Sequence, residues 1–275
     1  MADEPQYLLP EPEKELARLT EQDAFITHMM ENKRVLAPID FNRKELTILD
    51  SGTADGLFLR SIQPLLVEPY RLIGTDVMQS FFPSTVPPYT TFKIHDIAEP
   101  WPAELHGTCD LVHQRFTIPG GTKKATARDI VRYLCQLVRP GGWIQLVEMD
   151  VTVTAHGPAM RDAWAATGAF LTAAGAGTDY GKSMAGWLKE EGFEKISDDR
   201  VNLDVGARCD DAEWGARGAN ILVEAFTGVV GACKMMKLEV PDTILQDLPE
   251  RARKEMMEQG GIYPLIFANG RKPTA

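Results

Sequence analysis

The stretch between residues 46 and 57 constrains the fold of this chain more than any other. Four residues of strand character, 46–49, lead into the acidic residue Asp50. Small residues then follow at every second position, at Gly52, Ala54 and Gly56. A strand, a tight turn and a helix in this order bring backbone close to a ligand, which glycine permits because it has no Cβ. The stretch therefore predicts the first βα unit of a ligand-binding α/β fold.

Downstream of this unit, strand-like apolar segments alternate with helical spacers. We expect a helix over 127–138, a turn at 140–142, and strands over 71–75, 91–94, 110–113 and 143–148. This alternation indicates a parallel, doubly wound sheet. The remaining pattern predicts strands over 195–205 and 261–268, and helices over 13–32, 158–176, 182–191, 207–236 and 243–260.

Composition and charge narrow the classes of partner. The chain has 275 residues, a formal net charge of −10 and a pI near 5.1. It contains no dense block of Lys and Arg, so a nucleic acid and an anionic membrane surface are not expected partners. Its four cysteines form no C-x-x-C pair, which argues against a zinc site and a disulfide framework. We expect no metal, no membrane-spanning segment and a cytoplasmic location.

Acidic and polar side chains recur at the ends of the expected strands. Asp76 ends the second strand, Asp96 follows the third, and the fourth ends in His113-Gln114-Arg115. Carboxyl ends of parallel strands meet at one edge of the sheet, where open α/β sheets bind ligands. A carboxylate at the end of the second strand can accept hydrogen bonds from both hydroxyls of a ribose. The apolar Val77 that follows suits contact with a purine face.

A nicotinamide-dependent oxidoreductase is an alternative interpretation of the glycine-rich turn. Such a domain uses the spacing G-x-G-x-x-G, in which the third glycine packs the helix against the strand. Here the spacing is G-x-A-x-G, and the chain ends in an expected strand after a helical insertion. Both differences disfavour the oxidoreductase.

Two motifs resemble those of class I methyltransferases, which use S-adenosylmethionine. The segment 50–56 resembles their motif I, D-x-G-x-G-x-G, with Ala54 in place of the middle glycine, and 137–143 is similar to the L-x-P-G-G turn before their fifth strand. The resemblance implies a Rossmann-like, seven-stranded sheet, mostly parallel, with an antiparallel C-terminal strand. It also implies a helical N-terminal cap over 1–40 and a methyltransferase domain over 41–275, with helical substrate-cap insertions at about 151–190 and 206–250.

More specific segments are similar to methyltransferases of fungal secondary metabolism, a velvet-regulator-like family that also contains a global regulator of toxin production. The segments that carry this resemblance are Tyr7-Leu8-Leu9-Pro10, Glu15-Leu16-Ala17-Arg18-Leu19, Leu36-Ala37-Pro38, Glu99-Pro100-Trp101, His113-x-Arg115, Gly141 to Glu148, Tyr263-Pro264 and Gly270-Arg271-Lys272-Pro273. They span nearly the whole chain. Asp23 is a departure, because the family commonly has histidine there.

The resemblance implies a cofactor and a class of substrate. The cofactor would be S-adenosylmethionine, released as S-adenosylhomocysteine, and the substrate a small molecule bound by a monomeric enzyme. Within the family, the chain looks most like the thiomethyltransferases that cap both thiols of reduced epidithiodioxopiperazine toxins such as gliotoxin, a self-protection reaction. The residues expected to bind the cofactor are Tyr7, Asp50, Gly52, Asp76, Val77, Asp96, Ile97, Gln114 and Arg115.

The sequence does not single out a catalytic base. His113, Asp150 and His156 are candidates near the ends of the fourth and fifth strands. A thiol ionises near pH 8.5 and needs less help than an alcohol or amide, so the missing base favours a thiol acceptor and catalysis by proximity. The alternatives are O-methylation of a phenol or carboxylic acid, and a non-catalytic regulator that binds the cofactor and acts through protein partners.

Overall fold

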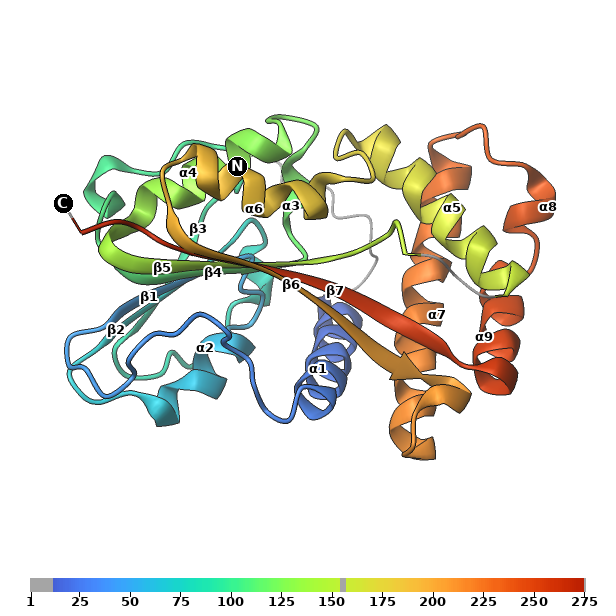
Figure 1. Cartoon of the computed structure of the whole chain (residues 1–275), viewed down its shortest axis with the longest axis horizontal. Coiled ribbons are helices and arrows are strands. Elements are labelled where there is room, and N and C mark those ends of the chain that lie inside the picture. The colour runs from blue at the N-terminus through green and yellow to red at the C-terminus, as the bar shows by residue number, and fades with distance from the viewer. Residues whose placement is uncertain (1–11, 154–156, 275) are drawn as a thin grey trace.

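The computed structural model of this chain describes residues 12–153 and 157–274. Its centre is a seven-stranded sheet in the order β3-β2-β1-β4-β5-β7-β6 (Figure 1). Strands from β3 to β5 are parallel, and β7 is antiparallel to both β5 and β6, so the expected fold class is confirmed. The strands are β1 (Thr47–Ser51), β2 (Arg71–Asp76), β3 (Thr90–Ile94), β4 (Cys109–Arg115), β5 (Val138–Met149), β6 (Glu194–Val205) and β7 (Gly261–Arg271).

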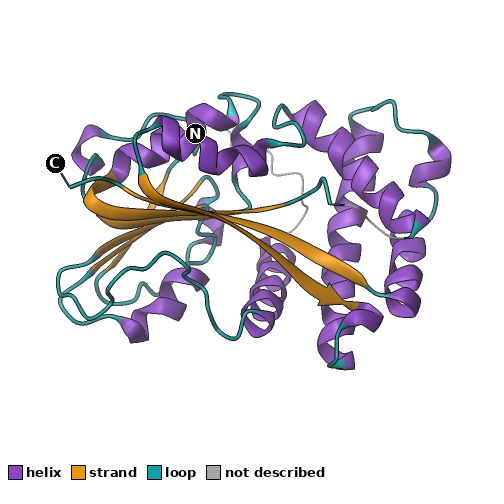
Figure 2. Ribbon diagram, viewed as in Figure 1, coloured by secondary structure: helices purple, strands orange, loops and turns teal. Residues whose placement is uncertain are grey.

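Helices cover both faces of the sheet (Figure 2). One face carries α3 (Ile118–Gly121), α4 (Ala127–Leu137) and α6 (Tyr180–Glu190), and the other carries α1 (Pro12–Met29) and α2 (Leu57–Ile62). A helical group packs beside the extended ends of β6 and β7, and consists of α5 (Pro158–Ala174), α7 (Ala212–Met235), α8 (Asp242–Leu245) and α9 (Leu248–Gln259). Short 3-10 turns are η1 (Gln63–Leu65), η2 (Gln79–Phe81), η3 (Ala103–Leu105) and η4 (Gly206–Arg208).

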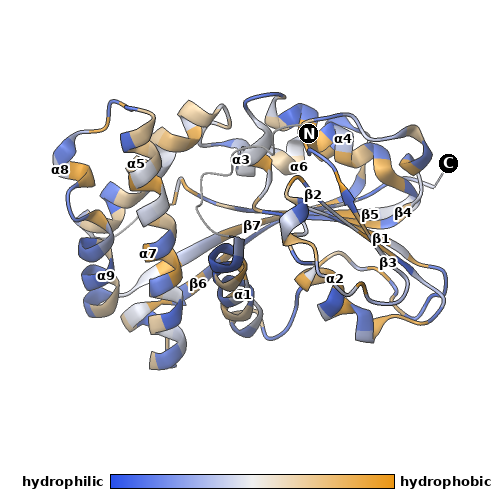
Figure 3. Cartoon of the chain, turned by 180° about the vertical axis from the view of Figure 1, so that it is seen from behind, coloured by the Kyte–Doolittle hydropathy of each residue, from blue (hydrophilic) through white to orange (hydrophobic). Residues whose placement is uncertain are grey.

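The inner strands are buried because helices cover both of their faces. Residues 110–114 of β4 and 143–148 of β5 are all buried, whereas the edge strands β3 and β6 are largely exposed. Such double burial explains why apolar residues are consecutive in the inner strands, as at 48–49, 111–112 and 146–147, rather than alternating with polar ones. In Figure 3 the outer helix α9 is largely hydrophilic. No helix within the described residues is long and apolar enough to cross a membrane.

Among the expected boundaries that differ from the structure, three have a clear local cause. The turn expected at 140–142 lies inside β5, as a bulge opposite Asp110 with Gly141 at φ 77°. Helix α7 begins at Ala212 rather than 207, because the Asp211 carboxylate accepts hydrogen bonds from the first exposed N–H groups. The helix expected over 243–260 divides into α8 and α9, because Gln246 and Asp247 leave helical backbone and Pro249, which has no N–H to donate to a preceding turn, stands in the first turn of α9.

Candidate functional site

A cavity of about 400 Å³ lies at the carboxyl edge of the sheet. Here β1 and β4 are neighbours although they are not consecutive in the chain, which is the position where open α/β sheets bind ligands. We call it the carboxyl-edge cavity. Its walls come from the turn after β1, the ends of β2, β4 and β5, and helices α1, α5 and α7.

Asp50 and His113 form a buried pair at the wall of this cavity. They are register partners on β1 and β4, and His113 Nδ1 lies 2.7 Å from Asp50 Oδ1. The imidazole also stacks on the ring of Phe58, with 3.7 Å between the ring centroids. His113 is only 3% exposed. These contacts hold the imidazole, a candidate base, between β1 and α2 at the cavity wall.

Asp76 joins the end of β2 to the glycine-rich turn. Its carboxylate accepts a hydrogen bond of 2.9 Å from the Ala54 N–H and one of 3.0 Å from the Met78 N–H. Burial raises the pKa of Asp76, and the backbone hydrogen bonds partly oppose that effect. Each carboxylate oxygen has two lone pairs, so Asp76 keeps acceptor capacity for a ligand at the cavity wall.

The turn after β1 is closely packed and left-handed at three positions, Gly52, Ala54 and Gly56. Gly52 has φ 73°, and a Cβ placed there would lie 2.0 Å from Thr117 Cγ2. Ala54 has φ 49°, a backbone conformation that favours glycine. This conformation explains why the motif has glycine at the position where this chain has alanine. Thr53 and Thr117 line the cavity, and their hydroxyls are buried and have no hydrogen-bond partner within the described residues.

Asp23 ties the first helix to the end of β4. Its two carboxylate oxygens accept from Arg34 and Arg115, with 2.9 Å between Arg115 Nη2 and Asp23 Oδ1. Asp23 is 2% exposed, so the two guanidinium groups compensate a buried charge. The aspartate that departs from the family pattern thus orients Arg115, which lines the cavity.

Glu148, at the end of β5, lines the cavity but received no role in our interpretation of the sequence. It accepts hydrogen bonds from Gln114 Nε2 at 2.6 Å, the Ile118 N–H at 3.1 Å and the Tyr180 hydroxyl at 3.0 Å. Burial raises its pKa to about 7, and these hydrogen bonds oppose the shift. A carboxyl group that titrates near neutral pH suits proton transfer. The sequence could have indicated Glu148 as a site residue, because it lies at the end of an apolar strand, as Asp50 and Asp76 do.

Other residues expected at the site lie outside the wall of the cavity. Asp96 accepts from Lys124 Nζ at 2.5 Å and from the Ala98 N–H. Burial tends to raise the pKa of Asp96, but the Lys124 contact holds it below its usual range. Val77, Ile97 and Gln114 do not line the cavity. Gln114 contacts a residue that does, because its Nε2 donates a hydrogen bond to Glu148.

The remaining candidates are engaged elsewhere or fall outside the structure described. Asp150 accepts hydrogen bonds from the Thr152 N–H and hydroxyl and pairs with Arg200, and it does not line the cavity. Tyr7 and His156 lie outside the described residues. Among the residues that are described, no group of three or more His, Cys, Asp or Glu side chains is arranged to hold a metal ion.

The far wall of the cavity is formed by two helical stripes. Helix α5 contributes Thr167, Phe170 and Leu171, and α7 contributes Glu224, Ala225, Gly228 and Val229. Both sets follow the spacing of three and four residues that places side chains on one helix face. A Cβ at Gly228 would meet no atom within 4 Å, so this glycine leaves open space.

Comparison with known proteins places the chain among methyltransferases. No protein-family model matches it. It is 37% identical to N-methyltransferase sirN of Leptosphaeria maculans, over 98% of this chain and 96% of that protein. It is 31% identical to Methyltransferase psoC of Aspergillus fumigatus, over 94% of each. Three more fungal relatives, 30–31% identical, are also named N-methyltransferases.

A solved structure supports the same fold. Phosphoethanolamine N-methyltransferase 2 of Haemonchus contortus, in complex with phosphomonomethylethanolamine and S-adenosylhomocysteine, matches with a TM-score of 0.52 at 12% identity. The match covers 94% of this chain and 52% of that one, and shows the fold alone. The sequence relatives carry the assignment further, because they match over nearly their full length. This chain belongs to the family of these fungal methyltransferases.

Proposed function

We propose that this chain transfers a methyl group from S-adenosylmethionine to a nitrogen atom of a small metabolite. The observation that carries the proposal is the carboxyl-edge cavity, in which a motif I-like turn and the end of β2 form one wall and two cap helices form the other. A cofactor and a small acceptor would therefore meet across it. The volume, about 400 Å³, is in the range of small-molecule sites.

The residues at the β1 turn fit the proposed cofactor. Asp76 has free lone pairs for ribose hydroxyls, and the partnerless hydroxyls of Thr53 and Thr117 offer further polar contacts. Arg115, held by Asp23, is available to a carboxylate. S-adenosylmethionine, when bound, supplies a methyl group on a positively charged sulfonium. We keep Asp50, Gly52, Asp76 and Arg115 as the proposed cofactor residues at the cavity wall.

Nitrogen is favoured as the acceptor atom by the names of four relatives, including sirN. The thiol acceptor expected from the sequence remains the principal alternative. The nitrogen and the thiol acceptor differ in their need for a base in the protein. A neutral nitrogen acceptor must lose a proton, whereas a thiolate has already lost it. We propose that Glu148 accepts that proton from the acceptor nitrogen as the carbon–nitrogen bond forms. Tyr180 and Gln114 would hold its carboxylate in place.

Mass spectrometry of the products tests the proposed function. The protein is incubated with S-adenosylmethionine and, separately, with a diketopiperazine amide, its reduced dithiol, a phenol and a carboxylic acid. A gain of one methyl mass on the amide, mapped to nitrogen by fragmentation, supports the proposal. Two methyl masses on the dithiol alone would replace it with S-methylation. If S-adenosylhomocysteine binds but no acceptor is methylated, the regulatory alternative gains support.

Substituting Gly228 tests whether the acceptor lies against α7. We expect Gly228→Leu to raise KM for the acceptor at least tenfold, because the new side chain occupies open space at the cavity wall. The affinity for S-adenosylhomocysteine, measured by calorimetry, should not change. Leucine is the better helix former by about 1 kcal/mol, so the fold should not suffer.

Gly231 provides the matched control for this substitution. It is on the same helix, a Cβ there also meets no atom within 4 Å, and it does not line the cavity. Gly231→Leu should therefore leave KM near the wild-type value. Equal effects of the two substitutions on KM would show that the acceptor does not contact this face of α7.

A further inference from the structure

A second cavity, of about 390 Å³, lies at the opposite edge of the sheet. It is lined by residues where β4 and β5 begin and where β7 ends, together with the segment 38–46. We call it the amino-edge cavity. It shares no lining residue with the carboxyl-edge cavity, so the methyl-transfer site does not account for it.

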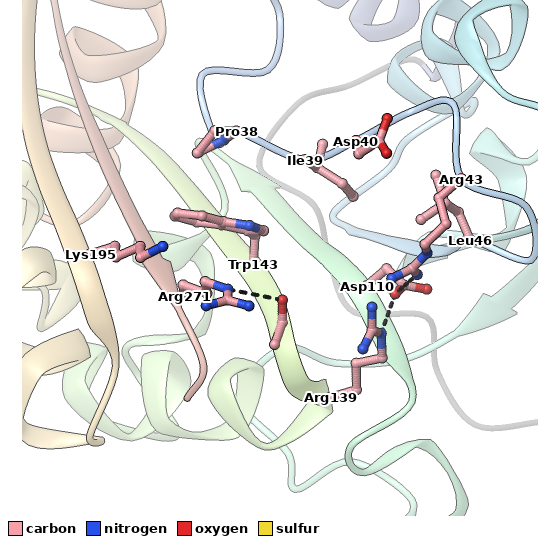
Figure 4. Close-up of a pocket in the computed structure, with 11 residues that line it drawn as sticks. Pro38, Ile39, Asp40, Arg43, Leu46, Asp110, Arg139, Trp143, Lys195 and Arg271 are labelled. Atoms are coloured by element: carbon pink, nitrogen blue, oxygen red, sulfur yellow. Dashed lines mark hydrogen bonds and ion pairs between the residues drawn. The ribbon is translucent and has the colours of Figure 1, made fainter. Parts of the chain in front are cut away.

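Positive charge is concentrated in this cavity. Four cationic side chains line it against two carboxylates, although the whole chain has a net charge of −10. Figure 4 shows two groups, with Lys195 and Arg271 beside the Trp143 ring on one side and Arg43 and Arg139 around Asp110 on the other. These residues come from five separate segments of the chain.

The buried Asp110 organises one of these groups. It is 4% exposed, and one of its oxygens accepts from both Arg43 and Arg139 while the other accepts from the Thr47 N–H at 2.8 Å. A single carboxylate thus holds two guanidinium groups at the cavity wall and compensates only one of their charges. Each guanidinium has five N–H donors, so donors remain for a further acceptor.

Lys195 and Arg271, beside the Trp143 ring, also keep donors. Arg271 pairs with Glu194 at 3.1 Å through Nη1 and donates from Nε to the Gly141 carbonyl, which leaves Nη2. Lys195 is exposed, and its side chain has no hydrogen bond or ion pair with any described residue. Trp143 is 8% exposed and presents an aromatic surface beside Lys195 and Arg271.

The two irregularities of strand pairing in the described sheet both lie at this cavity. The register shifts between Cys109 and Leu111, where β5 bulges through Arg139, and between Glu194 and Ser197, where β6 carries Lys195 at φ 49°. Bulges redirect side chains and are frequent beside functional sites. Left-handed backbone costs a residue other than glycine about 1–2 kcal/mol of conformational free energy. The surrounding structure must therefore stabilise the conformation of Lys195.

We propose that the amino-edge cavity binds a small organic anion. Its carboxylate or phosphate group would lie among Lys195, Arg271 and Arg139, and its flat or apolar body against Trp143 and Ile39. Guanidinium groups match the geometry of both oxyanions, so the cavity alone does not choose between them. The proposal is independent of methyl transfer.

Calorimetry with simple probes tests this site. Phenyl phosphate and benzoate are titrated into the full chain in separate experiments, with benzamide as the neutral analogue. We expect saturable binding of at least one anion, weaker binding of benzamide, and affinity that falls as salt is raised. The preferred anion distinguishes a phosphate ligand from a carboxylate. No saturable binding of either anion, or equal binding of benzamide, would overturn the proposal.

Two variants and one competitor locate the bound anion. Lys195→Gln should weaken binding about fivefold or more, as expected for loss of one partly exposed charge contact. Lys254→Gln removes the same charge from α9, away from the cavity, and should change nothing. S-adenosylhomocysteine should not compete with the anion. Unchanged affinity in Lys195→Gln, or competition by S-adenosylhomocysteine, would show that the anion binds elsewhere.

Discussion

Glu148→Gln is expected to lower kcat by a factor of about 10²–10³ while S-adenosylhomocysteine binds with unchanged affinity. The reason is that glutamine keeps the shape and part of the hydrogen bonding of Glu148 but cannot accept a proton from the acceptor. The wild-type rate should rise with pH and level off above about 7, because burial raises the Glu148 pKa to about 7 and only the ionised form is a base. The rise of the rate with pH should be absent in Glu148→Gln. Initial rates between pH 5 and pH 9 measure both effects.

The raised pKa of Glu148 also predicts how the free energy of unfolding depends on pH. Its pKa in the folded chain lies above the ordinary value of 4.5, so the folded state binds more protons than the unfolded state between these values. The stability that the protonated group contributes is complete below about 4.5 and is lost as pH rises through about 7. The loss is at most about 3 kcal/mol. Denaturant unfolding at several pH values should show it in the wild type and not in Glu148→Gln.

Asp150→Asn provides the control for the role of Glu148. Asp150 is two residues away but engages Thr152 and Arg200 instead of the cavity. We expect its substitution to change kcat less than threefold, because exposed ion pairs contribute about 1 kcal/mol or less. If Asp150→Asn abolished turnover while Glu148→Gln kept the wild-type pH profile, the assignment of the base would be wrong.

The sequence predicted the part of the site that depends on strand ends. The run ending at Asp50 and the run ending at Asp76 both lie where expected, because short apolar strands followed by an acid leave few alternatives in a parallel sheet. The alternation of strands and helices predicted the parallel part of the sheet, and the structure adds the order of its strands. The cap helices were located by their periodicity, with boundaries that shifted where Asp211 caps α7 and Pro249 interrupts the next helix.

Contacts between distant segments were not predictable from the sequence. Asp23 and Arg115 are 92 positions apart, and no local pattern indicates that they pair. Lys124 donates to Asp96 from the loop before α4, 28 positions away, and no local pattern indicates this contact either. The raised pKa of Glu148 depends on complete burial beneath α3 and α6, which only the tertiary structure determines. The amino-edge cavity likewise depends on bulges in β5 and β6. The sequence predicted a turn at the first of these positions and a regular strand at the second.

Gly52→Ala is expected to weaken S-adenosylhomocysteine binding at least tenfold, which corresponds to about 1.4 kcal/mol. Alanine at φ 73° would carry left-handed strain, and its Cβ would overlap Thr117 Cγ2 at 2.0 Å. The turn must then move away from β4, and the wall formed by Gly52 and Thr117 moves with it. Calorimetric titration gives the affinity, and thermal unfolding shows whether the fold survives.

Two further variants separate steric overlap from a general loss of structure. Gly52→Ala combined with Thr117→Ser removes the overlapping methyl group, keeps the hydroxyl, and should recover part of the lost affinity. Ala54→Gly restores the motif glycine at φ 49°, relieves strain and should retain binding, with a change in stability below about 1 kcal/mol. Full affinity in Gly52→Ala would mean that the cofactor does not approach this turn. Because Asp76 accepts from the Ala54 N–H, the proposed ribose contact would then also need another location.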